Sequence, residues 1–377
     1  MGRFTNAPLP SINLISKSLL KSGRLRNDFL NPWRINDHLI FPLSRSAWSL
    51  KLIAKYKIIQ SNNSSLSILV PSYFCNSSLA PLREMKVSLV FYPIKKNGEP
   101  DIDEVINILA NEKIDIIIGV HFFGSRMNFT ELSSIARKCN IWFVEDFAHL
   151  LNLPKVDKIK SDFQLFSPHK FLPIPDGALL SVNKRIFETD TEESNFVELH
   201  KSLVLKKRSY SKAYLWLLKR LLQKLNFGIK VGINDYYHDE QINNPRSFFK
   251  PGMTNLSQSL LSVLIEDLEQ NKLSRQENAH AWKRLVLNRY PSAKVLFPEE
   301  AIESYYLIGF EFSDDEELKE ALRWFDLKKF PVSTWPDLPQ EILDNNYYFR
   351  QSIRLRNNSI FFQVHSSIDK KTIESFL

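Results

Sequence analysis

Short apolar runs alternate with helix-like segments along the first half of the chain, from about residue 43 to residue 182. The apolar runs cover residues 66–70, 87–91, 114–120, 141–144 and 177–182. Between them, residues 46–57, 77–85, 102–111 and 129–138 carry apolar side chains at helical spacing. This alternation predicts an α/β fold in which helices cover a mainly parallel sheet.

The composition changes after residue 186. Residues 188–193 are acidic and residues 201–230 are basic. The basic stretch contains one apolar stripe at helical spacing, made of Ala213, Tyr214, Leu217, Leu218, Leu221, Leu222 and Leu225. An amphipathic helix of this kind favours packing on the core or on a second subunit, and attachment to a membrane surface is the alternative.

The length of 377 residues indicates two packed domains. A long helical pattern covers residues 253–289, and strand-like runs at 306–312 and 359–364 follow it. We therefore expect a large domain over residues 1–250, with a basic helical insertion at about 195–245. A smaller C-terminal α+β domain is expected over residues 251–377.

Glycine and charge content narrow the class of protein. Only 10 glycines are present, and none lies in a G-x-G-x-x-G or G-x-x-x-x-G-K pattern, which argues against nucleotide folds that hold phosphate on glycine loops. The net charge of +8, from 50 Lys and Arg against 42 Asp and Glu, favours anionic partners. Motifs of nucleic-acid-binding modules are missing, and a polyanionic small substrate fits the charge equally well.

Cysteine content and the N-terminus indicate the compartment. The two cysteines, Cys75 and Cys139, are too few for a disulfide scaffold or a zinc site, so no metal is expected. The N-terminus lacks the apolar run of a secretory signal. These features favour a cytoplasmic protein without a membrane span.

Charged side chains follow two of the apolar runs. Residues 141–144 lead into Glu145 and Asp146, and residues 163–166 lead into a Ser-Pro-His-Lys sequence that ends at Lys170. Ligands of open parallel sheets bind beyond the carboxyl ends of the strands, so Asp146 and Lys170 are expected at one edge. The pair is either a buried ion pair or the site of a lysine whose lowered pKa makes its amine nucleophilic. His121, which ends another apolar run, is assigned equally to a core position and to substrate contact.

Four longer segments share one order: Val-Pro-Ser-Tyr-Phe-Cys at 70–75, His-Phe-Phe-Gly at 121–124, Val-Glu-Asp-Phe-Ala-His at 144–149 and Ser-Pro-His-Lys-Phe-Leu-Pro-Ile-Pro-Asp-Gly at 167–177. Together they resemble the DegT/DnrJ/EryC1/StrS family. Leu-Ser-Arg-Ser-Ala at 43–47 resembles the family's phosphate-binding turn. Met-Thr-Asn-Leu at 253–256 and Arg-Gln-Glu-Asn at 275–278 resemble its entry to the small domain. The resemblance covers about residues 41–287.

The resemblance implies a fold and a cofactor. Members of this family are aminotransferases of fold type I that depend on pyridoxal 5′-phosphate (PLP), with pyridoxamine phosphate (PMP) as an intermediate. A homodimer is expected, in which the large domain holds a mainly parallel seven-stranded sheet flanked by helices. The second domain is expected to be small and α+β.

The resemblance also assigns three catalytic residues. Lys170 would bind the cofactor covalently and move the proton during the reaction. Asp146 would pair with the pyridine nitrogen of the cofactor, and His149 would contact its phenolic oxygen. His149 and Asp146 would face the ring from one side if a helix began at Asp146. A hydrogen-bonded core histidine is the alternative for His149.

A phosphate site is implied at the start of the helix expected at 46–57, where backbone N–H groups and the helix dipole favour anions. Ser44, Arg45 and Ser46 stand there, and Ser167 would lie opposite. Ser44 replaces the usual glycine of the family, and Arg45 either contacts the phosphate or points to solvent. Lys250 aligns with an asparagine that in many relatives reaches the cofactor phosphate of the neighbouring subunit.

Further candidates lie around the cofactor ring and the substrate. The residue stacked on the ring is Tyr73, Phe74 or Cys75, and an aromatic residue is favoured. Tyr73, His121 and His169 are candidates for substrate contact. Some family members replace the lysine by histidine and act as dehydratases from the PMP form, so Lys170, next to His169, favours transamination.

The sequence thus predicts an enzyme that moves an amino group, expected from glutamate, to a nucleotide-linked keto-deoxy-sugar. Such a product serves polysaccharide, lipopolysaccharide or secondary-metabolite biosynthesis. The expected partners are the nucleotide sugar, the amino-acid donor and a second copy of the chain, without nucleic acid. Two alternatives are a PMP-dependent sugar dehydratase and a non-catalytic binding or scaffolding subunit, the latter motivated by the departures at Ser44, Lys250 and Ser366.

Overall fold

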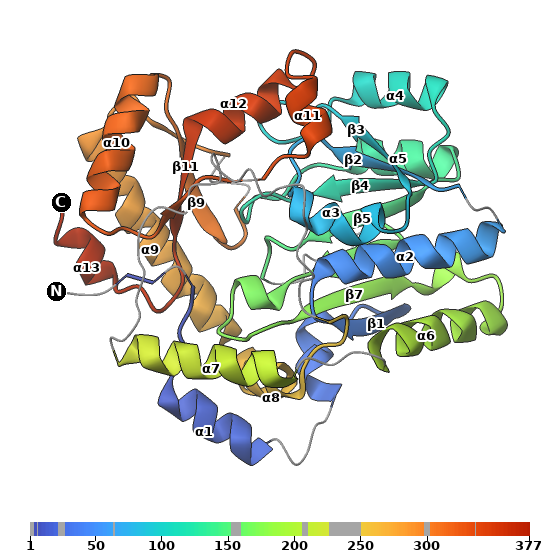
Figure 1. Cartoon of the computed structure of the whole chain (residues 1–377), viewed down its shortest axis with the longest axis horizontal. Helices are drawn as coiled ribbons and strands as arrows, with labels where there is room; N and C mark the ends of the chain where they lie inside the picture. The colour runs from blue at the N-terminus through green and yellow to red at the C-terminus, as the bar shows by residue number, and fades with distance from the viewer. Residues whose placement is uncertain are drawn as a thin grey trace.

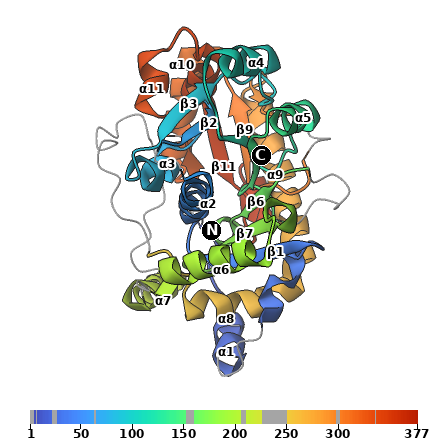
Figure 2. The ribbon, with the colours of Figure 1, turned by 90° about the vertical axis from the view of Figure 1, so that its right-hand side faces the viewer.

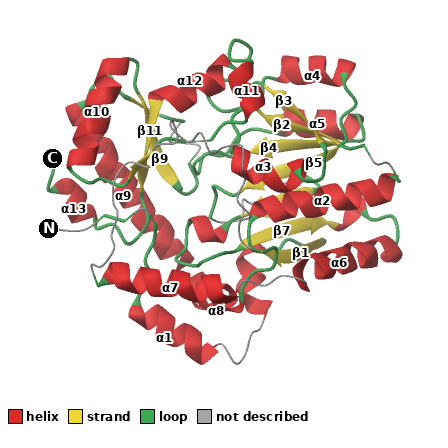
Figure 3. Ribbon diagram, viewed as in Figure 1, coloured by secondary structure: helices red, strands yellow, loops and turns green. Residues whose placement is uncertain are grey.

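The computed structural model describes residues 4–5, 7–21, 27–62, 65–151, 160–205, 210–225, 250–297, 302–335 and 337–377. Part of the basic insertion expected at about 195–245 lies outside these residues. The described helices and strands form two assemblies, each around its own sheet (Figure 1, Figure 3).

The larger sheet contains seven strands in the described part of the chain, in the order β1-β7-β6-β5-β4-β2-β3. The pairs β2/β3, β2/β4, β4/β5 and β5/β6 are parallel, and β7 runs antiparallel to both of its neighbours. The mainly parallel sheet expected from the alternating pattern is confirmed. The strands are β1 His38–Leu43, β2 Ser67–Pro71, β3 Ser88–Tyr92, β4 Ile116–Val120, β5 Trp142–Phe147, β6 Phe163–Phe166 and β7 Ala178–Asn183.

The apolar pattern did not reveal β1. This strand lies at the sheet edge, is only partly buried and contains Pro42, which lacks the N–H group that a central strand needs. Its pairing with β7 runs from His38 opposite Asn183 to Leu43 opposite Ala178. As a result, the turn after β1 lies beside the turn that precedes β7.

Helices cover the larger sheet on both faces. The helices expected between the apolar runs are confirmed as α2 Ser46–Ser61, α3 Asn76–Arg83, α4 Ile102–Asn111 and α5 Thr130–Lys138, and α6 Asp190–Leu205 follows β7. Neighbouring residues of a strand point to opposite faces. In β5, Trp142 stacks on Tyr56 of α2, whereas Phe143 packs on Phe129, just before α5. Every residue of β5 is therefore buried.

The smaller assembly is an antiparallel sheet with its own core. Its described strands are ordered β10-β11-β9-β8, and Trp282, Phe310 and Phe362 are fully buried against its helices. This arrangement agrees with the α+β character expected near the C-terminus, while the exact limits of 1–250 and 251–377 stay a prediction. The elements are α9 Leu268–Arg289, β8 Lys294–Val295, β9 Leu307–Glu311, α10 Asp315–Leu327, β10 Val332–Ser333, α11 Gln340–Asp344, α12 Arg350–Asn358, β11 Ser359–Gln363 and α13 Lys370–Glu374.

Three helices lie together at one end of the molecule in both ribbon views (Figure 1, Figure 2). They are α1 Ile12–Lys21, α7 Tyr210–Lys224 and α8 Asn255–Leu264, and α8 packs against both of the others. The remaining short turns are the 3-10 helices η1 Asn27–Trp33, η3 Pro168–Lys170, η4 Lys184–Ile186 and η6 Ile265–Asp267. Among the described residues, no helix is long and apolar enough to cross a membrane.

The apolar stripe expected in the basic insertion lies on α7. Ala213 is buried and Leu217 packs on the core, but Tyr214, Leu218, Leu222 and Leu225 are exposed. The interpretation that the stripe packs on the core is therefore wrong for these four residues. The reason is geometric: at 3.6 residues per turn, a stripe this wide covers more of the helix circumference than one core contact can bury.

Candidate functional site

The carboxyl ends of β5 and β6 bring the predicted charged residues together. These strands are parallel neighbours, with Asp146 opposite Leu165 and Phe147 opposite Phe166. After β6 the chain makes the single turn η3, which ends at Lys170. His149 follows β5, and its Nε2 atom lies 3.0 Å from Lys170 Nζ. Asp146, His149 and Lys170 thus form one cluster at this edge of the sheet.

The helical explanation given for His149 is wrong. β5 continues through Phe147, and His149 lies in a turn in which the Leu150 N–H donates to the Phe147 carbonyl. The Asp146 carboxylate accepts the Ala148 N–H at 2.8 Å, which shapes the start of this turn. His149 therefore reaches Lys170 from a turn that follows the strand, and no helix starts at Asp146.

Two hydrogen bonds define the tautomer of His149. The backbone N–H of Phe123 lies 3.4 Å from His149 Nδ1 and can only donate, so Nδ1 is the unprotonated ring nitrogen. The proton of a neutral ring then resides on Nε2, which donates to Lys170 Nζ. Lys170 Nζ can accept this hydrogen bond only when it is a neutral amine.

The pKa directions of the cluster agree with this arrangement. Burial lowers the pKa of Lys170, and the Asp146 charge opposes part of this shift. Burial also lowers the pKa of His149 well below its usual value, and Lys170 lowers it further. The pKa of Asp146 is raised by burial, while Lys170 and the Ala148 N–H oppose the rise. Each group is therefore displaced toward its neutral form by burial.

Aromatic rings enclose His149. Phe123 stacks on one side at 5.2 Å between centroids, Tyr306 stacks on the other side at 4.7 Å, and Trp335 contacts the edge at 5.2 Å. The Lys170 amine also lies 5.6 Å from the Tyr306 ring centroid. Tyr306 and Trp335 come from the C-terminal part of the chain, so the cluster joins both assemblies.

The serines predicted to bind phosphate lie in adjoining turns. Gly177 connects these turns. Its N–H donates to the Ser44 carbonyl, and its carbonyl accepts two hydrogen bonds from His169, one from the backbone N–H and one from Nδ1–H. The hydroxyl oxygens of Ser44 and Ser167 are buried and have no hydrogen-bond partner within the described part of the chain. Ser46 begins α2 directly after Ser44 and Arg45. Two unsatisfied hydroxyls and a helix start thus lie near Lys170.

Arg45 points inward, toward the turn before β7. Its guanidinium donates to the carbonyls of Ser44 at 2.8 Å and Pro175 at 3.0 Å. Burial lowers its pKa to about 10, and the nearby charge of Asp176 opposes this shift. Of the two positions left open for Arg45, the solvent-facing one is wrong. The missed residue here is Asp176, whose carboxylate accepts the Thr254 N–H at 3.0 Å.

The candidates for ring stacking lie at the start of α3. Tyr73 is fully buried and donates its hydroxyl to the Trp335 carbonyl. The Cys75 thiol donates to Asp337 at 2.7 Å, and burial together with Asp337 raises its pKa to about 12. Phe74 is buried as well. Tyr73 and Cys75 are thus held by residues of the C-terminal part of the chain.

His121 and Lys250 lie apart from these contacts. His121 accepts the Met127 N–H on Nδ1, stacks on Phe147, and its Nε2 atom is 3.5 Å from Glu145 Oε1. These partners favour the core position for His121 over substrate contact. Lys250 is exposed. Its predicted contact, with the cofactor phosphate of a neighbouring subunit, stays a prediction.

Arg275 is a site residue that the motifs did not reveal as such. Its buried guanidinium donates to the carbonyls of Phe171 at 2.6 Å and of Tyr305 and Tyr306 at 3.2 Å each. Burial lowers its pKa to about 9. Besides Asn271 Oδ1, which accepts from Arg275 Nε within the same helix, its acceptors are these backbone carbonyls far away in the sequence, so no local pattern could identify this role. Arg275 holds the residue after Lys170 against the backbone of Tyr306.

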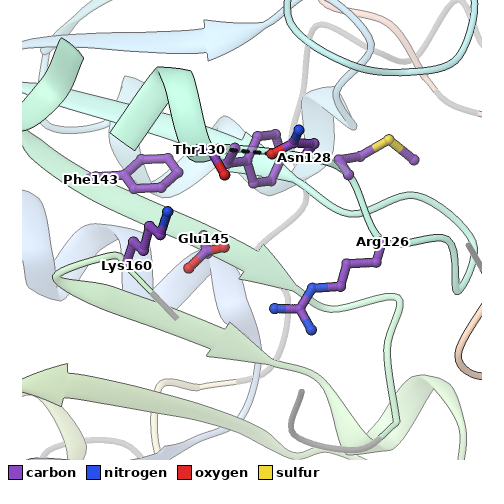
Figure 4. Close-up of a pocket in the computed structure, with 8 residues that line it drawn as sticks. Arg126, Asn128, Thr130, Phe143, Glu145 and Lys160 are labelled. Atoms are coloured by element: carbon purple, nitrogen blue, oxygen red, sulfur yellow. Dashed lines mark hydrogen bonds between the residues drawn. The ribbon is translucent and has the colours of Figure 1, made fainter. Parts of the chain in front are cut away.

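A cavity opens on the face of β5 that lies opposite to Asp146. Its volume is about 420 Å³, and Arg126, Glu145 and Lys160 contribute charged side chains to its wall (Figure 4). Glu145 and Asp146 are successive strand residues and point to opposite faces. This cavity is therefore distinct from the Lys170 cluster. Lys160, which lines the cavity, lies outside that cluster and can serve as a control for substitutions of Lys170.

Comparison with known proteins agrees with this geometry. Residues 52–169 match the family model of the DegT/DnrJ/EryC1/StrS aminotransferase family. A curated relative is UDP-4-amino-4,6-dideoxy-N-acetyl-beta-L-altrosamine transaminase of Campylobacter jejuni, 32% identical over 106 residues. The match covers 26% of this chain and 28% of that protein.

Solved structures share the fold over the whole chain. The PLP form of Spr1654 from Streptococcus pneumoniae has a TM-score of 0.73 at 14% identity, covering 100% of this chain and 96% of that one. The aminotransferase TlmJ from Streptoalloteichus hindustanus has a TM-score of 0.69 at 13% identity, with the same coverage. E. coli GDP-4-keto-6-deoxy-D-mannose-3-dehydratase with bound hydrated PLP has a TM-score of 0.68 at 15% identity, covering 100% and 98%. The fold class expected from the sequence, that of PLP-dependent aminotransferases, is confirmed.

Proposed function

We propose that this chain is a PLP-dependent aminotransferase that delivers an amino group, drawn from glutamate, to a nucleotide-linked keto-deoxy-sugar. The observation that carries the proposal is the 3.0 Å contact between Lys170 Nζ and His149 Nε2, beside the buried carboxylate of Asp146. The family match over residues 52–169 supports the reaction type. The curated relative, a nucleotide-sugar transaminase by name, supports the substrate class.

The residues present fit the cofactor. The hydroxyls of Ser44 and Ser167 lack partners, and the start of α2 supplies N–H groups, which is what a phosphate requires. Asp146 offers a buried carboxylate for a protonated ring nitrogen, and Lys170 offers an amine whose pKa burial lowers, which favours attack on the aldehyde. When bound, PLP supplies an aldehyde that holds an amine and a ring that delocalises the electrons released when a carbon loses its proton.

The protein's own groups perform the remaining tasks. His149 Nε2–H orients the Lys170 amine by donating to it, so Nζ is ready to take up and return a proton. Tyr306, Trp335 and Phe123 surround the imidazole and exclude water from it. Arg275 fixes the backbone after Lys170 and keeps the amine in place.

A homodimer belongs to the proposal, with Lys250 of one copy near the phosphate site of the other. We also place the enzyme in the cytoplasm, as a supplier of amino sugars for polysaccharide, lipopolysaccharide or secondary-metabolite biosynthesis. Lys250 carries a point charge that suits a phosphate. The exposure of its side chain is compatible with a contact to a second chain.

The test is amination of nucleotide-linked keto-deoxy-sugars by the purified protein with PLP and glutamate, followed by mass spectrometry. The expected product carries one amino group in place of the keto oxygen, together with one 2-oxoglutarate per product. Lys170→Ala should abolish this product. A sugar product that has lost a hydroxyl group and gained no nitrogen would instead support a dehydratase, the second candidate, which the structural likeness to the E. coli dehydratase favours.

A non-catalytic subunit predicts a third result. In that case PLP would not raise the melting temperature of the protein, because a ligand stabilises a fold only when it binds the native state. We expect a rise in melting temperature with PLP concentration for the wild type.

A further inference from the structure

Helix α7 presents an unusual surface outside the candidate active site. Tyr214, Leu215, Leu218, Leu222 and Leu225 are all exposed, with 42% to 65% of each side chain accessible. Monomeric soluble proteins rarely expose a contiguous apolar stripe of this kind, whereas scattered apolar residues are common. The stripe lies outside the proposed active site, so the proposed reaction does not account for it.

The orientation of α7 makes this stripe its outer face. Leu215, Leu218, Leu222 and Leu225 are spaced by three, four and three residues, so they lie on one side of the helix. Ala213 is buried and Trp216 packs on the core, which defines the inner side. The helix is therefore attached to the protein by one side and directs leucines outward on the other.

The charges on α7 are of one sign. Its sequence contains no Asp or Glu, and its charged residues are Lys212, Lys219, Arg220 and Lys224. Lys212, Lys219 and Lys224 are exposed. By helical spacing, Lys212 and Lys219 border one side of the leucine stripe, whereas Lys224, the last residue of the helix, lies on the side of Ala213 and Leu217.

The neighbouring helix α1 has the same character. Its sequence also lacks Asp and Glu, Lys17 is exposed, and Ile12 and Leu20 are 68% and 85% exposed. Both helices pack on α8 and lie at the same end of the molecule in two perpendicular views (Figure 1, Figure 2). Apolar and basic side chains therefore occur on both helices at this end.

These observations favour one kind of partner. An outward apolar face with lysines along one border is a pattern of helices that lie in the interface of a membrane with anionic lipids. The lysines attract anionic headgroups, and the leucines enter the acyl boundary. Pairing of α7 with α7 of a second copy would bring the lysines of both chains together, which opposes association. We propose that α7, with α1 beside it, docks this protein on the surface of an anionic membrane.

The test is co-sedimentation of the full-length protein with large vesicles. One set contains phosphatidylcholine and phosphatidylglycerol in a ratio of about 2:1, and the other contains phosphatidylcholine alone. We expect binding to the anionic set at low salt, and at least about tenfold weaker binding to the neutral set or at high salt. The variant L218E/L222E should lose vesicle binding. In K212Q/K219Q/K224Q, each replacement of a lysine should weaken vesicle binding about fivefold.

Leu327→Glu is the matched control. Leu327 is an even more exposed leucine at the end of α10, 77% accessible, and its replacement should leave vesicle binding unchanged. PLP absorbance and the melting temperature confirm that each variant is folded. Because the lysine variant leaves all leucines in place, it tests the proposal even if L218E/L222E does not fold.

Three results would overturn the proposal. The first is equal sedimentation of the wild type with and without vesicles, and the second is equal binding to neutral and anionic vesicles. The third is a wild-type oligomer that L218E/L222E converts to a smaller species in light scattering, without vesicle binding by either protein. That last result would assign the face to a contact between copies of this chain.

Discussion

At the scale of single residues, Lys170 and His149 fix each other's protonation state. The motif at 144–149 and the Lys170 motif could be found in the sequence, because they are local. The tautomer could not be predicted, since it depends on the Phe123 N–H, which a separate loop brings within 3.4 Å of His149 Nδ1. The same holds for Tyr306 and Trp335, which reach the cluster only through tertiary packing.

The two orphaned hydroxyls give a prediction at this scale. Ser167→Ala should weaken PLP binding about tenfold, the effect of one lost hydrogen bond to a charged group. It should not lower the stability of the cofactor-free protein, because the Ser167 hydroxyl has no partner among the described residues. Spectroscopic titration with PLP and urea unfolding measure the two effects.

Ser49→Ala provides the control for this prediction. The Ser49 hydroxyl is equally buried and also without a described partner, but it lies on α2 itself, three residues after Ser46. Its replacement should leave PLP affinity unchanged. Equal losses of affinity in both variants would show that the effect is not a phosphate contact.

A buried histidine gives a pH prediction. His365 donates from Nε2 to the Thr5 carbonyl, and burial lowers its pKa from 6.5 to about 3. The unfolded chain therefore takes up the proton first, and stability is lost as the pH falls below 6.5. The His365→Gln variant keeps a donor and does not titrate. As the pH falls, its free energy of unfolding should therefore decrease less steeply than that of the wild type, by up to about 1.4 kcal/mol per pH unit. Urea unfolding between about pH 7 and pH 5 tests this, and parallel curves for both proteins would contradict it.

At the scale of elements, the contacts between the two sheets decide the site. The helical pattern over 253–289 predicted a helix, and α8, η6 and α9 occupy that range. The pattern could not show that Arg275 of α9 binds the carbonyls of Phe171, Tyr305 and Tyr306, because hydrogen bonds to backbone carbonyls leave no signature in the sequence of the acceptors. The edge strand β1 was overlooked for a similar reason, since its pairing and not its hydropathy defines it.

Arg275→Met should destabilise the protein by about 2–4 kcal/mol, because it leaves buried carbonyls without donors. Arg275→Lys should lose less, since an ammonium can still reach part of these acceptors. Urea unfolding measures both losses. The pH dependence of the lysine-bound cofactor spectrum should also shift in Arg275→Lys if the guanidinium positions Lys170, and an unchanged spectrum would assign Arg275 a purely structural role.

Gly124 sits where the loop after β4 meets the C-terminal part of the chain. Its φ is +103°, and a Cβ atom there would lie 2.0 Å from the Ser304 carbonyl oxygen. Gly124→Ala should therefore lower the free energy of unfolding by about 3 kcal/mol or more. Gly119→Ala should lower the free energy of unfolding less, because the nearest atoms to its Cβ would be those of the Phe129 ring, at 3.0 Å. Thermal unfolding compares the two, and equal losses would contradict this account.

At the scale of the whole molecule, two sheets with separate cores meet around Lys170. The large sheet supplies Asp146, His149, Lys170 and the serine turns, and the C-terminal part supplies Tyr306, Trp335 and Asp337. The sequence predicted the fold class because hydrophobic periodicity and motif order are carried along the chain. Of the partners left open for the α7 stripe, the core is excluded for its outer half, because periodicity identifies an apolar face but not what covers it.

The most direct test of the central claim is the visible absorption spectrum of the purified protein after addition of PLP. We predict a visible band of lysine-bound cofactor in the wild type and in Lys160→Ala, because Lys160 lines the cavity on the opposite face of β5. The band should be absent in Lys170→Ala. A colourless wild type, or a Lys170→Ala variant that keeps the band, would contradict the assignment of Lys170 as the residue that binds the cofactor.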